Sequence, residues 1–435
     1  MPVVFDSFYL TAVTLGAPYI ITKMFTSERF RSGLSQRLGW LPTREGSRPC
    51  LWVHGASVGE VLTARSLVTT VEESLPGWDI VLSTSTNTGF SVAKKNFEDK
   101  LVFYFPLDFS WVDRKALSLL KPNCIILVEL EIWPNFLVAA VQRGIPVVLV
   151  NGRISERSTK VLKTLRLFSR SFSQSLQAPG NIYCVRTQTD ATRFLKLGIP
   201  KEKVIITGNM KYDNIPLAVP EEEKERLRQS FRISPEDLVI VGGSTHPGEE
   251  EILLRVFKTL RATLPIRLIL VPRHIERAQE VEGLIRNMGF PLVKKSLLDK
   301  TGDFPTNPRD TVLVVDTMGE LTKIYSLAHC VFVGKSLKGL GGQNVLEPAG
   351  LARPTIFGPN MTNFQEEANL LLEADAARLV HNEEELLATV GHLLRTPQEA
   401  EAMGLRAQKV VTENRGATLR NLKVLEKILR ENKTR

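Results

Sequence analysis

The chain is 435 residues long, and at roughly 100 to 200 residues per domain this length predicts two or three domains. Its 43% hydrophobic and 24% charged residues exclude a mainly disordered protein and a protein with many membrane spans. The formal net charge of +9 indicates an anionic partner, and charge alone allows nucleic acid, a phosphorylated ligand or an acidic membrane surface.

The first predicted element is an apolar helix near the N-terminus. Residues 7–22 carry no charge, but this stretch is shorter than the roughly 20 residues of a spanning helix. Asp6 precedes it, and basic residues follow it at Lys23, Arg29, Arg31 and Arg37. By the positive-inside rule the rest of the chain stays in the cytoplasm, and the basic residues favour acidic lipid. We predict that residues 1–24 form a membrane anchor or an interfacial helix; a packed N-terminal helix is the alternative.

From Leu51 onward, short β-branched runs alternate with longer helical stretches, which is typical of a parallel α/β sheet. A proline-containing joint interrupts this alternation after Asp213. We therefore predict two doubly wound, Rossmann-like α/β domains with a cleft between them. Their predicted bounds are residues 25–213 and 223–410, joined by a linker at 214–222. Residues 411–435 are predicted to form a C-terminal helix with a solvated face and a basic tail.

The first candidate for chemistry is the segment HGASVGE at residues 54–60, which lies between a predicted strand and a predicted helix. Gly55 and Gly59 let the backbone approach a ligand, and the first helical turn offers N–H groups that favour anions. Glu60 is thereby expected near the top of the sheet, where α/β folds place their chemistry, as a candidate general base. The alternative is that Glu60 only complements the helix dipole.

The second candidate is VELEIWPN at residues 128–135, which ends an apolar strand. Glu129 and Glu131 would point to the same side on a strand and diverge once the chain turns at Trp133 and Pro134. Carboxylates at a strand end are costly unless they are hydrogen-bonded or functional. The alternative is a pair of surface acids with Trp133 as a core plug.

The third candidate is Lys211 in TGNMKYD, at the edge of the predicted cleft. A lysine at this boundary is placed to meet an anionic leaving group or a carboxylate. The alternative is an ordinary solvated lysine.

Four similar turns follow apolar strands in the second half of the chain, at residues 242–251, 271–274, 316–321 and 341–348. Small and polar residues between a strand and a helix make phosphate and nucleotide cradles. Arg273 is a candidate partner for a phosphate, and Glu347 for ribose hydroxyls. The four turns together predict a nucleotide site.

Several mechanisms lack their motifs in this chain. There is no GxxxxGK[ST], GxGxxG or HExxH, and the six histidines have no ligand spacing, so we predict chemistry without a metal or a cofactor. The four cysteines lie far apart with no CxxC pair, which indicates a reducing compartment. RNP-like aromatic strands and basic DNA-binding helices are absent, so nucleic acid is not expected as the partner.

Eight motifs in order give the chain its resemblance to a known family: HGASVGE, VELEIWPN, NGRIS, TGNMKYD, GGSTHPGEEE, VPRH, DTMGEL and GGQNVLEPA. With them the chain closely resembles the 3-deoxy-D-manno-octulosonic acid (Kdo) transferases, glycosyltransferase family 30. The resemblance implies a GT-B architecture and an N-terminal anchor in the cell inner membrane. It also implies transfer of Kdo from CMP-Kdo to a lipid A precursor, lipid IVA, with release of CMP, by an inverting, metal-independent single displacement in lipopolysaccharide core biosynthesis.

The resemblance also assigns roles to individual positions. Glu60 matches the proton acceptor, and Glu129 and Lys211 match the transition-state stabilisers. The CMP-binding positions it implies are Pro272, Arg273, Met318, Gly319, Glu320, Asn344, Val345, Leu346 and Glu347. The family usually reads GGHNPLEP where this chain has Gln343 and Val345, and GGS where it has residues 334–336. Gln343 keeps hydrogen-bonding capacity but has no titratable ring, so a proton role at that position is in doubt.

Two rival functions remain compatible with the sequence. One is another GT-B enzyme, such as a UDP-sugar transferase or a non-hydrolysing epimerase. The other is a membrane-bound nucleotide-sugar sensor without turnover, against which the retention of Glu60, Glu129 and Lys211 speaks. The number of Kdo residues transferred and the oligomeric state are left open.

Overall fold

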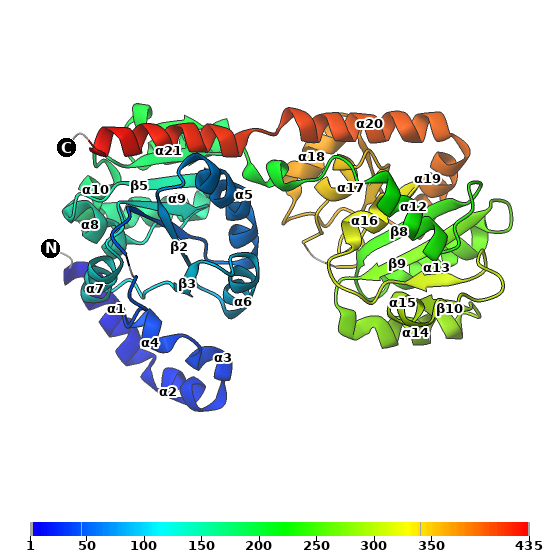
Figure 1. Cartoon of the computed structure of the whole chain (residues 1–435), viewed down its shortest axis with the longest axis horizontal. Coiled ribbons are helices and arrows are strands. Elements are labelled where there is room, and N and C mark those ends of the chain that lie inside the picture. Colours follow the sequence, from blue (N-terminus) through cyan, green and yellow to red (C-terminus); the bar gives the residue numbers. More distant parts are fainter. Residues whose placement is uncertain (1–2, 45, 340, 434–435) are drawn as a thin grey trace. The chain divides into compact units, whose positions relative to one another are not determined.

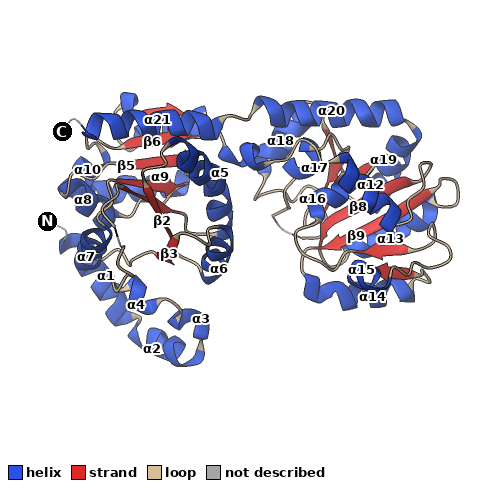
Figure 2. Ribbon diagram, in the orientation of Figure 1, coloured by secondary structure: helices blue, strands red, loops and turns tan. Residues whose placement is uncertain are grey.

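The computed structural model describes residues 3–44, 46–339 and 341–433, and it divides into two compact units (Figure 1). Unit 1 comprises Met1–Asn214 and Arg415–Arg435, and unit 2 comprises Ile215–Asn414. Each unit has one seven-stranded parallel sheet with helices around it (Figure 2). The predicted pair of Rossmann-like α/β domains is therefore confirmed.

The sheet of unit 1 has the strand order β3-β2-β1-β4-β5-β6-β7, which reverses between β1 and β4. Ligands of such sheets bind at this switch point, outside the carboxyl ends of the strands. The strands are β1 (Cys50–His54), β2 (Asp79–Thr84), β3 (Leu101–Tyr104), β4 (Cys124–Val128), β5 (Val147–Gly152), β6 (Ile182–Val185) and β7 (Val204–Ile206). The helices are α1 (Val3–Leu15), α2 (Ala17–Thr26), α3 (Glu28–Arg31), α4 (Leu34–Arg37), α5 (Val58–Ser74), α6 (Asn87–Asn96), α7 (Ser110–Leu120), α8 (Pro134–Gln142), α9 (Glu156–Phe168), α10 (Arg170–Leu176), α11 (Gln188–Lys196), the 3₁₀ turns η1 (Lys201–Lys203) and η2 (Met210–Asn214), and α21 (Ala417–Lys433).

The sheet of unit 2 has the order β10-β11-β9-β8-β12-β13-β14 and reverses between β8 and β12. Its strands are β8 (Leu238–Thr245), β9 (Ile266–Pro272), β10 (Leu292–Lys294), β11 (Val312–Val314), β12 (Cys330–Val333), β13 (Thr355–Phe357) and β14 (Ala377–Leu379). Its helices are α12 (Glu221–Ser230), α13 (Glu249–Leu260), η3 (Ile275–Arg277), α14 (Ala278–Asn287), α15 (Lys295–Thr301), α16 (Leu321–Tyr325), α17 (Leu346–Gly350), α18 (Gln365–Glu373), α19 (Glu383–Arg395) and α20 (Pro397–Glu413).

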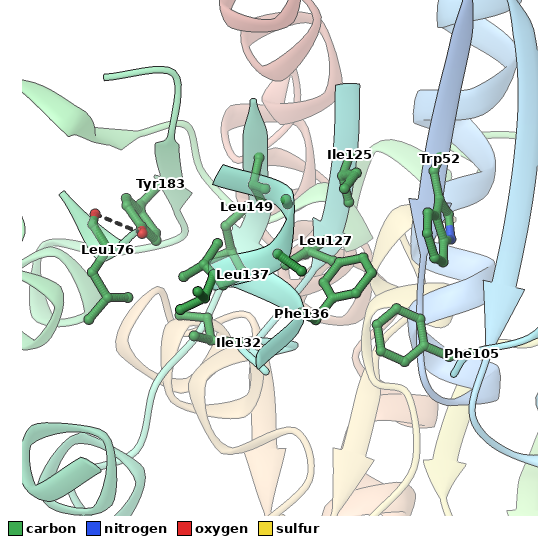
Figure 3. Close-up of a cluster of buried hydrophobic side chains, with 14 of the residues drawn as sticks. Trp52, Phe105, Ile125, Leu127, Ile132, Phe136, Leu137, Leu149, Leu176 and Tyr183 are labelled. Carbon is green, nitrogen blue, oxygen red and sulfur yellow. Dashed lines mark hydrogen bonds between the residues drawn. The ribbon is translucent and has the colours of Figure 1, made fainter. Parts of the chain in front are cut away.

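The hydrophobic core of unit 1 packs around β1. Strands β1 and β4 are buried along their whole length because helices cover both faces of the sheet. On one face Trp52 packs against Phe136 and Phe105, with ring centroids 5.1 and 5.8 Å apart (Figure 3). The indole Nε1 of Trp52 donates to Ser83 Oγ at 2.7 Å, so its polar group is satisfied inside the core.

The last helix, α21, belongs to unit 1 although it follows the whole of unit 2 in the chain (Figure 1). Leu422, Leu425 and Leu429 recur at helical spacing and join the same buried cluster as α5. The carboxylate of Asp213 accepts from the N–H groups of Gly416 and Thr418 at the start of α21, both at 2.6 Å. The face that the sequence analysis treated as solvated is thus partly a core face.

The N-terminal segment is not the single helix that the sequence predicts. It forms α1 and α2, which are bent by 66° at the break between them. Pro18 has no N–H with which to continue the backbone hydrogen bonds of α1. Gly16 has no side chain that has to be packed at the bend. Among the described residues no single helix is long and apolar enough to cross a membrane, whereas the bent pair reaches that length and composition.

The first turns of α1 are docked on unit 1. Asp6 is buried and accepts from the Ser110 N–H at 2.9 Å and from Asn135 Nδ2 at 2.9 Å. The hydroxyl of Tyr9 donates to Asp108 at 2.8 Å. The packed-helix alternative therefore describes the docked residues of α1, while both helices also expose large apolar side chains.

Candidate active site

Glu60 lies in the first turn of α5, just beyond the carboxyl end of β1. Its two carboxylate oxygens are held separately, one by the Ala56 N–H at 2.6 Å and one by the Ser57 hydroxyl at 3.0 Å. Burial, followed by the nearby charges of Glu131 and Glu129, raises the pKa of Glu60 to about 7. A fixed carboxyl group that titrates near neutral pH is suited to general-base chemistry.

Gly55 explains how Glu60 comes so close to the strand end. A Cβ atom added at Gly55 would lie 3.1 Å from the Cβ of Glu60 and 3.2 Å from the backbone nitrogen of Val61. A side chain at this position would therefore push the first turn of α5 away from β1.

Glu129 is the first residue after β4 and has a positive φ of 63°. Its N–H donates to Val150 O at 3.0 Å, so the sheet ladder is kept while the chain turns. A non-glycine residue in this left-handed region is strained, and such strain clusters at functional sites.

Glu131 accepts two hydrogen bonds on the same oxygen. His54 Nε2 lies 3.2 Å and Trp133 Nε1 lies 2.9 Å from its Oε2. Trp133 is 39% exposed, so the interpretation of this residue as a core plug is wrong. The sequence analysis gave Glu131 no partner and gave His54 no role, although His54 begins the HGASVGE segment and ends a buried strand.

Lys211 lies in η2, which packs against α5. Its own N–H donates to Asn209 Oδ1 at 3.0 Å, and the preceding N–H of Met210 donates to Asn151 Oδ1 at 2.9 Å. Asn151 is buried near the end of β5 and has a positive φ of 54°. The backbone that carries Lys211 is thus fixed beside the helix that carries Glu60.

In unit 2, three of the predicted CMP-binding residues lie together at the carboxyl edge of the sheet. Glu347 accepts from Asn344 Nδ2 at 3.0 Å, and Thr322 Oγ1 donates to it at 3.2 Å. Burial raises the pKa of Glu347, and the charge of Arg273 opposes this rise because it is nearby. Arg273 itself is exposed directly after β9. These groups combine a cation with hydrogen-bonding side chains, as a nucleotide site requires.

The loop after β11 carries the next predicted residues. Met318 is 85% exposed, and Gly319 has a positive φ of 83°, which glycine adopts without strain. Glu320 accepts from Thr317 Oγ1 and forms an ion pair with the buried Lys295 at 2.9 Å. Glu320 lies two residues before Thr322, so this loop adjoins Glu347 through the start of α16.

The remaining predicted CMP-binding residues have buried side chains. Pro272 ends β9, and Val345 and Leu346 begin the turn into α17. The Leu346 N–H donates to Asn344 Oδ1 at 3.1 Å, which fixes the Asn344 side chain. These three side chains pack inside unit 2 and shape the loops.

Glu249 is a residue of this edge that the sequence analysis did not single out. It is fully buried, and its carboxylate accepts from the N–H groups of His246, Lys335, Ser336 and Leu337 at 2.8–3.1 Å. The Glu249 N–H in turn donates to His246 O at 3.0 Å, so these two residues close the turn that leads into α13. The GEEE run predicts acidic residues in the first turn of a helix, but the contact of Glu249 with the loop after β12 has no signal in it.

Within the described ranges, no group of three or more His, Cys, Asp or Glu side chains is placed to hold a metal ion. The candidate site residues form two groups, one on each unit. Unit 1 carries the carboxylates and Lys211, and unit 2 carries the residues around Glu347.

The chain is similar to several known proteins. A family model described as 3-Deoxy-D-manno-octulosonic-acid transferase (kdotransferase) matches residues 32–214. The chain is 32% identical over 434 residues to the 3-deoxy-D-manno-octulosonic acid transferase of Haemophilus influenzae, covering 98% of this chain and 99% of that protein. It is 30% identical over 404 residues to the enzyme of the same description from Chlamydophila psittaci, covering 92% and 90%. A solved glycosyltransferase structure from Rickettsia africae shares the fold, with a TM-score of 0.57 at 12% identity and coverage of 88% and 99%.

Proposed function

Because this chain belongs to the Kdo transferase family of glycosyltransferases, we propose that it transfers Kdo from CMP-Kdo to a lipid A precursor, lipid IVA, and releases CMP in lipopolysaccharide core biosynthesis. The observation that carries this proposal is Glu60, a carboxylate held by Ala56 and Ser57 with a pKa near 7. A base of this strength can accept a sugar hydroxyl proton at neutral pH.

The reaction we propose is a single displacement. The acceptor hydroxyl oxygen bonds to the anomeric carbon of Kdo, its proton passes to Glu60, and the bond from that carbon to the phosphate oxygen breaks with release of CMP. One displacement inverts the anomeric configuration. The transition state of this displacement has oxocarbenium character, and a carboxylate such as Glu129 stabilises its positive charge. Lys211 supplies a positive charge for the carboxylate of Kdo or for the leaving phosphate.

Unit 2 is proposed to bind the CMP part of the donor. Arg273 provides the charge for the phosphate, and Asn344 and Glu347 provide hydrogen bonds for ribose hydroxyls. Glu320 and the exposed Met318 border the same edge of the sheet. Release of the phosphate then relies on protein cations and N–H groups instead of a metal ion.

The N-terminal helices are proposed to bind the cytoplasmic face of the inner membrane. These helices expose large apolar residues, among them Phe8 at 67%, Leu15 at 80%, Tyr19 at 65% and Phe25 at 82%. Apolar side chains next to basic residues are typical of helices that bind acidic lipid surfaces.

The basic residues behind these helices are not equivalent. Arg31 is exposed and caps α2 by donating to Met24 O at 2.9 Å. Arg37 instead turns inward, where it donates to Ser85 O at 2.6 Å and lies over the Tyr104 ring. Lys23 and Arg31 are therefore the cations that we assign to the lipid surface, and Arg37 is not.

The choice of donor is tested by a thermal-shift titration of the whole chain with CMP and with UDP. The proposal predicts that CMP raises the melting temperature and that UDP at the same concentration raises it much less. Stronger protection by UDP would contradict the proposal and favour a UDP-sugar enzyme of the same fold.

A further inference from the structure

Two loops of unit 2 meet where the strand order of its sheet reverses, between β8 and β12. Ligands of doubly wound sheets bind at such a point, outside the carboxyl ends of the strands. His246 directly follows β8, and Lys335 is the second residue after β12. The proposed reaction uses neither residue, although both lie at the edge of the sheet that is proposed to bind CMP.

Glu249 ties these two loops together. Its Oε2 accepts from the backbone N–H of His246 at 2.9 Å and from the backbone N–H of Lys335 at 2.8 Å. Gly334 permits this close approach, because a Cβ atom added there would lie only 2.6 Å from the Cα of Thr245. The backbone of Lys335 is therefore fixed beside the end of β8.

Lys335 also adjoins the turn that carries the proposed ribose contacts. Its carbonyl oxygen accepts from the Gly342 N–H at 3.0 Å, and Asn344 follows Gly342 two residues later. Asn344 in turn donates to Glu347. In CMP the phosphate is bonded to the ribose, so a cation next to the ribose contacts suits the phosphate.

The loop that carries Arg273 adjoins the same cluster. The ring centroids of His246 and His274 lie 5.8 Å apart, and His274 directly follows Arg273. Lys335, His246 and Arg273 thus follow three neighbouring strands, β12, β8 and β9. Their loops form one continuous edge of the sheet.

The backbone conformation of Lys335 is unusual for a lysine. Its φ is 59°, in the left-handed region that glycine adopts freely and that residues with a Cβ atom adopt at a cost. Residues with such strain cluster at ligand sites. Gly339 leaves room for the side chain, because a Cβ atom at Gly339 would lie 2.7 Å from Lys335 Cγ. The loop therefore accommodates a long side chain where glycine would be less strained.

Lys335 brings a positive charge to this edge that is not neutralised by an ion pair. Among residues 3–44, 46–339 and 341–433, no carboxylate pairs with its ammonium group. Both oxygens of Glu249 accept backbone N–H groups instead. Burial lowers the pKa of His246, so its ring is mainly neutral at neutral pH, and its Nδ1 proton is directed to Ser244 O, 3.2 Å away. An anion bound here would therefore meet the charge of Lys335.

We infer that Lys335 binds the phosphate of CMP, as a second cation in addition to Arg273, and so helps to hold the charge of the leaving group. This inference rests on the proposed function, in which unit 2 binds the CMP part of the donor. Hydrogen bonds between charged groups are about twice as strong as neutral ones, so the loss of this contact should lower the affinity for CMP.

The test is calorimetric titration of the full-length protein and its variants with CMP at one salt concentration. Lys335→Met keeps the aliphatic side chain and removes the charge, so the CMP affinity should fall roughly tenfold. Lys335→Arg should keep most of the affinity. Lys338→Met is the matched control, because Lys338 is an exposed lysine of the same loop, and it should bind CMP as the wild type does. Equal CMP affinities of Lys335→Met and the wild type, or an equal loss in Lys338→Met, would overturn the inference.

Cytidine locates the contact on the nucleotide. It lacks the phosphate, so displacement of CMP by cytidine should give the same cytidine affinity for the wild type and for Lys335→Met. A cytidine affinity that falls as much as the CMP affinity would show that Lys335 only shapes the loop. An unchanged CMP affinity together with a raised KM for CMP-Kdo would place Lys335 on the sugar carboxylate and refute the phosphate contact.

Lys335→Gly separates binding from folding. Glycine adopts the left-handed backbone without strain, so the melting temperature without CMP should not fall, whereas the CMP affinity should again fall roughly tenfold. Wild-type CMP affinity of this variant would refute the inference. Failure of the proposed function would look different, because the wild type itself would then bind UDP more tightly than CMP.

Discussion

His54 Nε2 lies 3.2 Å from Glu131 Oε2, although 77 residues separate these two residues in the chain. His54 ends β1, and its neighbour in the parallel register is Leu127 of β4, so the two strand ends lie side by side at the switch point of the sheet. Glu60, in the first turn of α5, lies at the same edge of the sheet. The three side chains lie at the edge of the sheet where doubly wound folds bind their ligands.

Replacing Glu60 by Ala should remove the base while the donor site on unit 2 stays intact. Turnover should fall by at least roughly 100-fold, which is a common effect of losing a general base. CMP-Kdo should still raise the melting temperature as it does in the wild type. Glu73→Ala is the matched control because Glu73 is an exposed glutamate on the same helix and should leave turnover unchanged. Equal turnover of Glu60→Ala and this control would refute the role.

The raised pKa of Glu60 also has a consequence for stability. A carboxyl group whose pKa rises from 4.5 in the unfolded chain to about 7 on folding is favourable below the unfolded value, and this contribution is lost as pH rises through about 7. Glu60→Gln, which stays neutral, should therefore melt at a higher temperature than the wild type at pH 8. The difference should disappear near pH 4. A lower melting temperature of Glu60→Gln at pH 8 would contradict the claim that the ionised, buried Glu60 carboxylate destabilises the folded protein.

Arg273→Ala should weaken CMP binding because it removes the cation beside Glu347. Loss of a charge-assisted hydrogen bond predicts a roughly tenfold to hundredfold weaker CMP affinity, measured by calorimetry. Arg286→Ala is the control, since Arg286 is exposed on α14 and pairs only locally with Glu282. An unchanged CMP affinity of Arg273→Ala would count against its contact with the nucleotide.

Glu249→Gln should destabilise the loop after β12. The amide keeps the shape of the carboxylate but turns one acceptor oxygen into a donor that faces backbone N–H groups. We expect unit 2 to lose about 2–4 kcal/mol of stability in denaturant unfolding. Glu251→Gln, at an exposed site on α13, should lose less than about 0.5 kcal/mol. Equal effects of the two variants would show that Glu249 does not hold the loop.

Phe25→Asp should weaken binding to vesicles that contain acidic lipid. Exclusion of one large apolar side chain from the bilayer predicts roughly a tenfold loss of affinity in co-sedimentation. Leu405→Asp gives the same chemical change at a residue that is 54% exposed on α20 of unit 2, and it should leave vesicle binding unchanged. Equal vesicle binding by Phe25→Asp and the wild type would contradict membrane contact through α2.

The sequence predicted those features that depend on local patterns. Alternating apolar strands and helices predicted both parallel sheets, and the turn after each strand directed attention to the carboxyl edge of each sheet. Glu60 carries a local signal, because Ser57 and Glu60 form a capping box at the start of α5. The search for polar turns directly after apolar strands also singled out the loops that carry Arg273 and Glu347.

Features that depend on distant segments could not be predicted in this way. The pairing of His54 with Glu131 requires the register between β1 and β4. The packing of α21 on unit 1 requires the chain to return after unit 2, and the burial of Glu249 requires the loop after β12. Pro18 is a visible sequence signal for the bend at Gly16. The docking of α1 through Asp6 and Tyr9 has no such signal, because the partner residues are distant in the chain.

The most direct test of the account is mass spectrometry of the lipid product after incubation of the full-length protein with CMP-Kdo and a tetraacylated disaccharide acceptor. The account predicts that the acceptor gains the mass of one or more Kdo residues in step with CMP release, and that Glu60→Ala reduces both by at least roughly 100-fold. An acceptor of unchanged mass, or equal product from the wild type and Glu60→Ala, would contradict it.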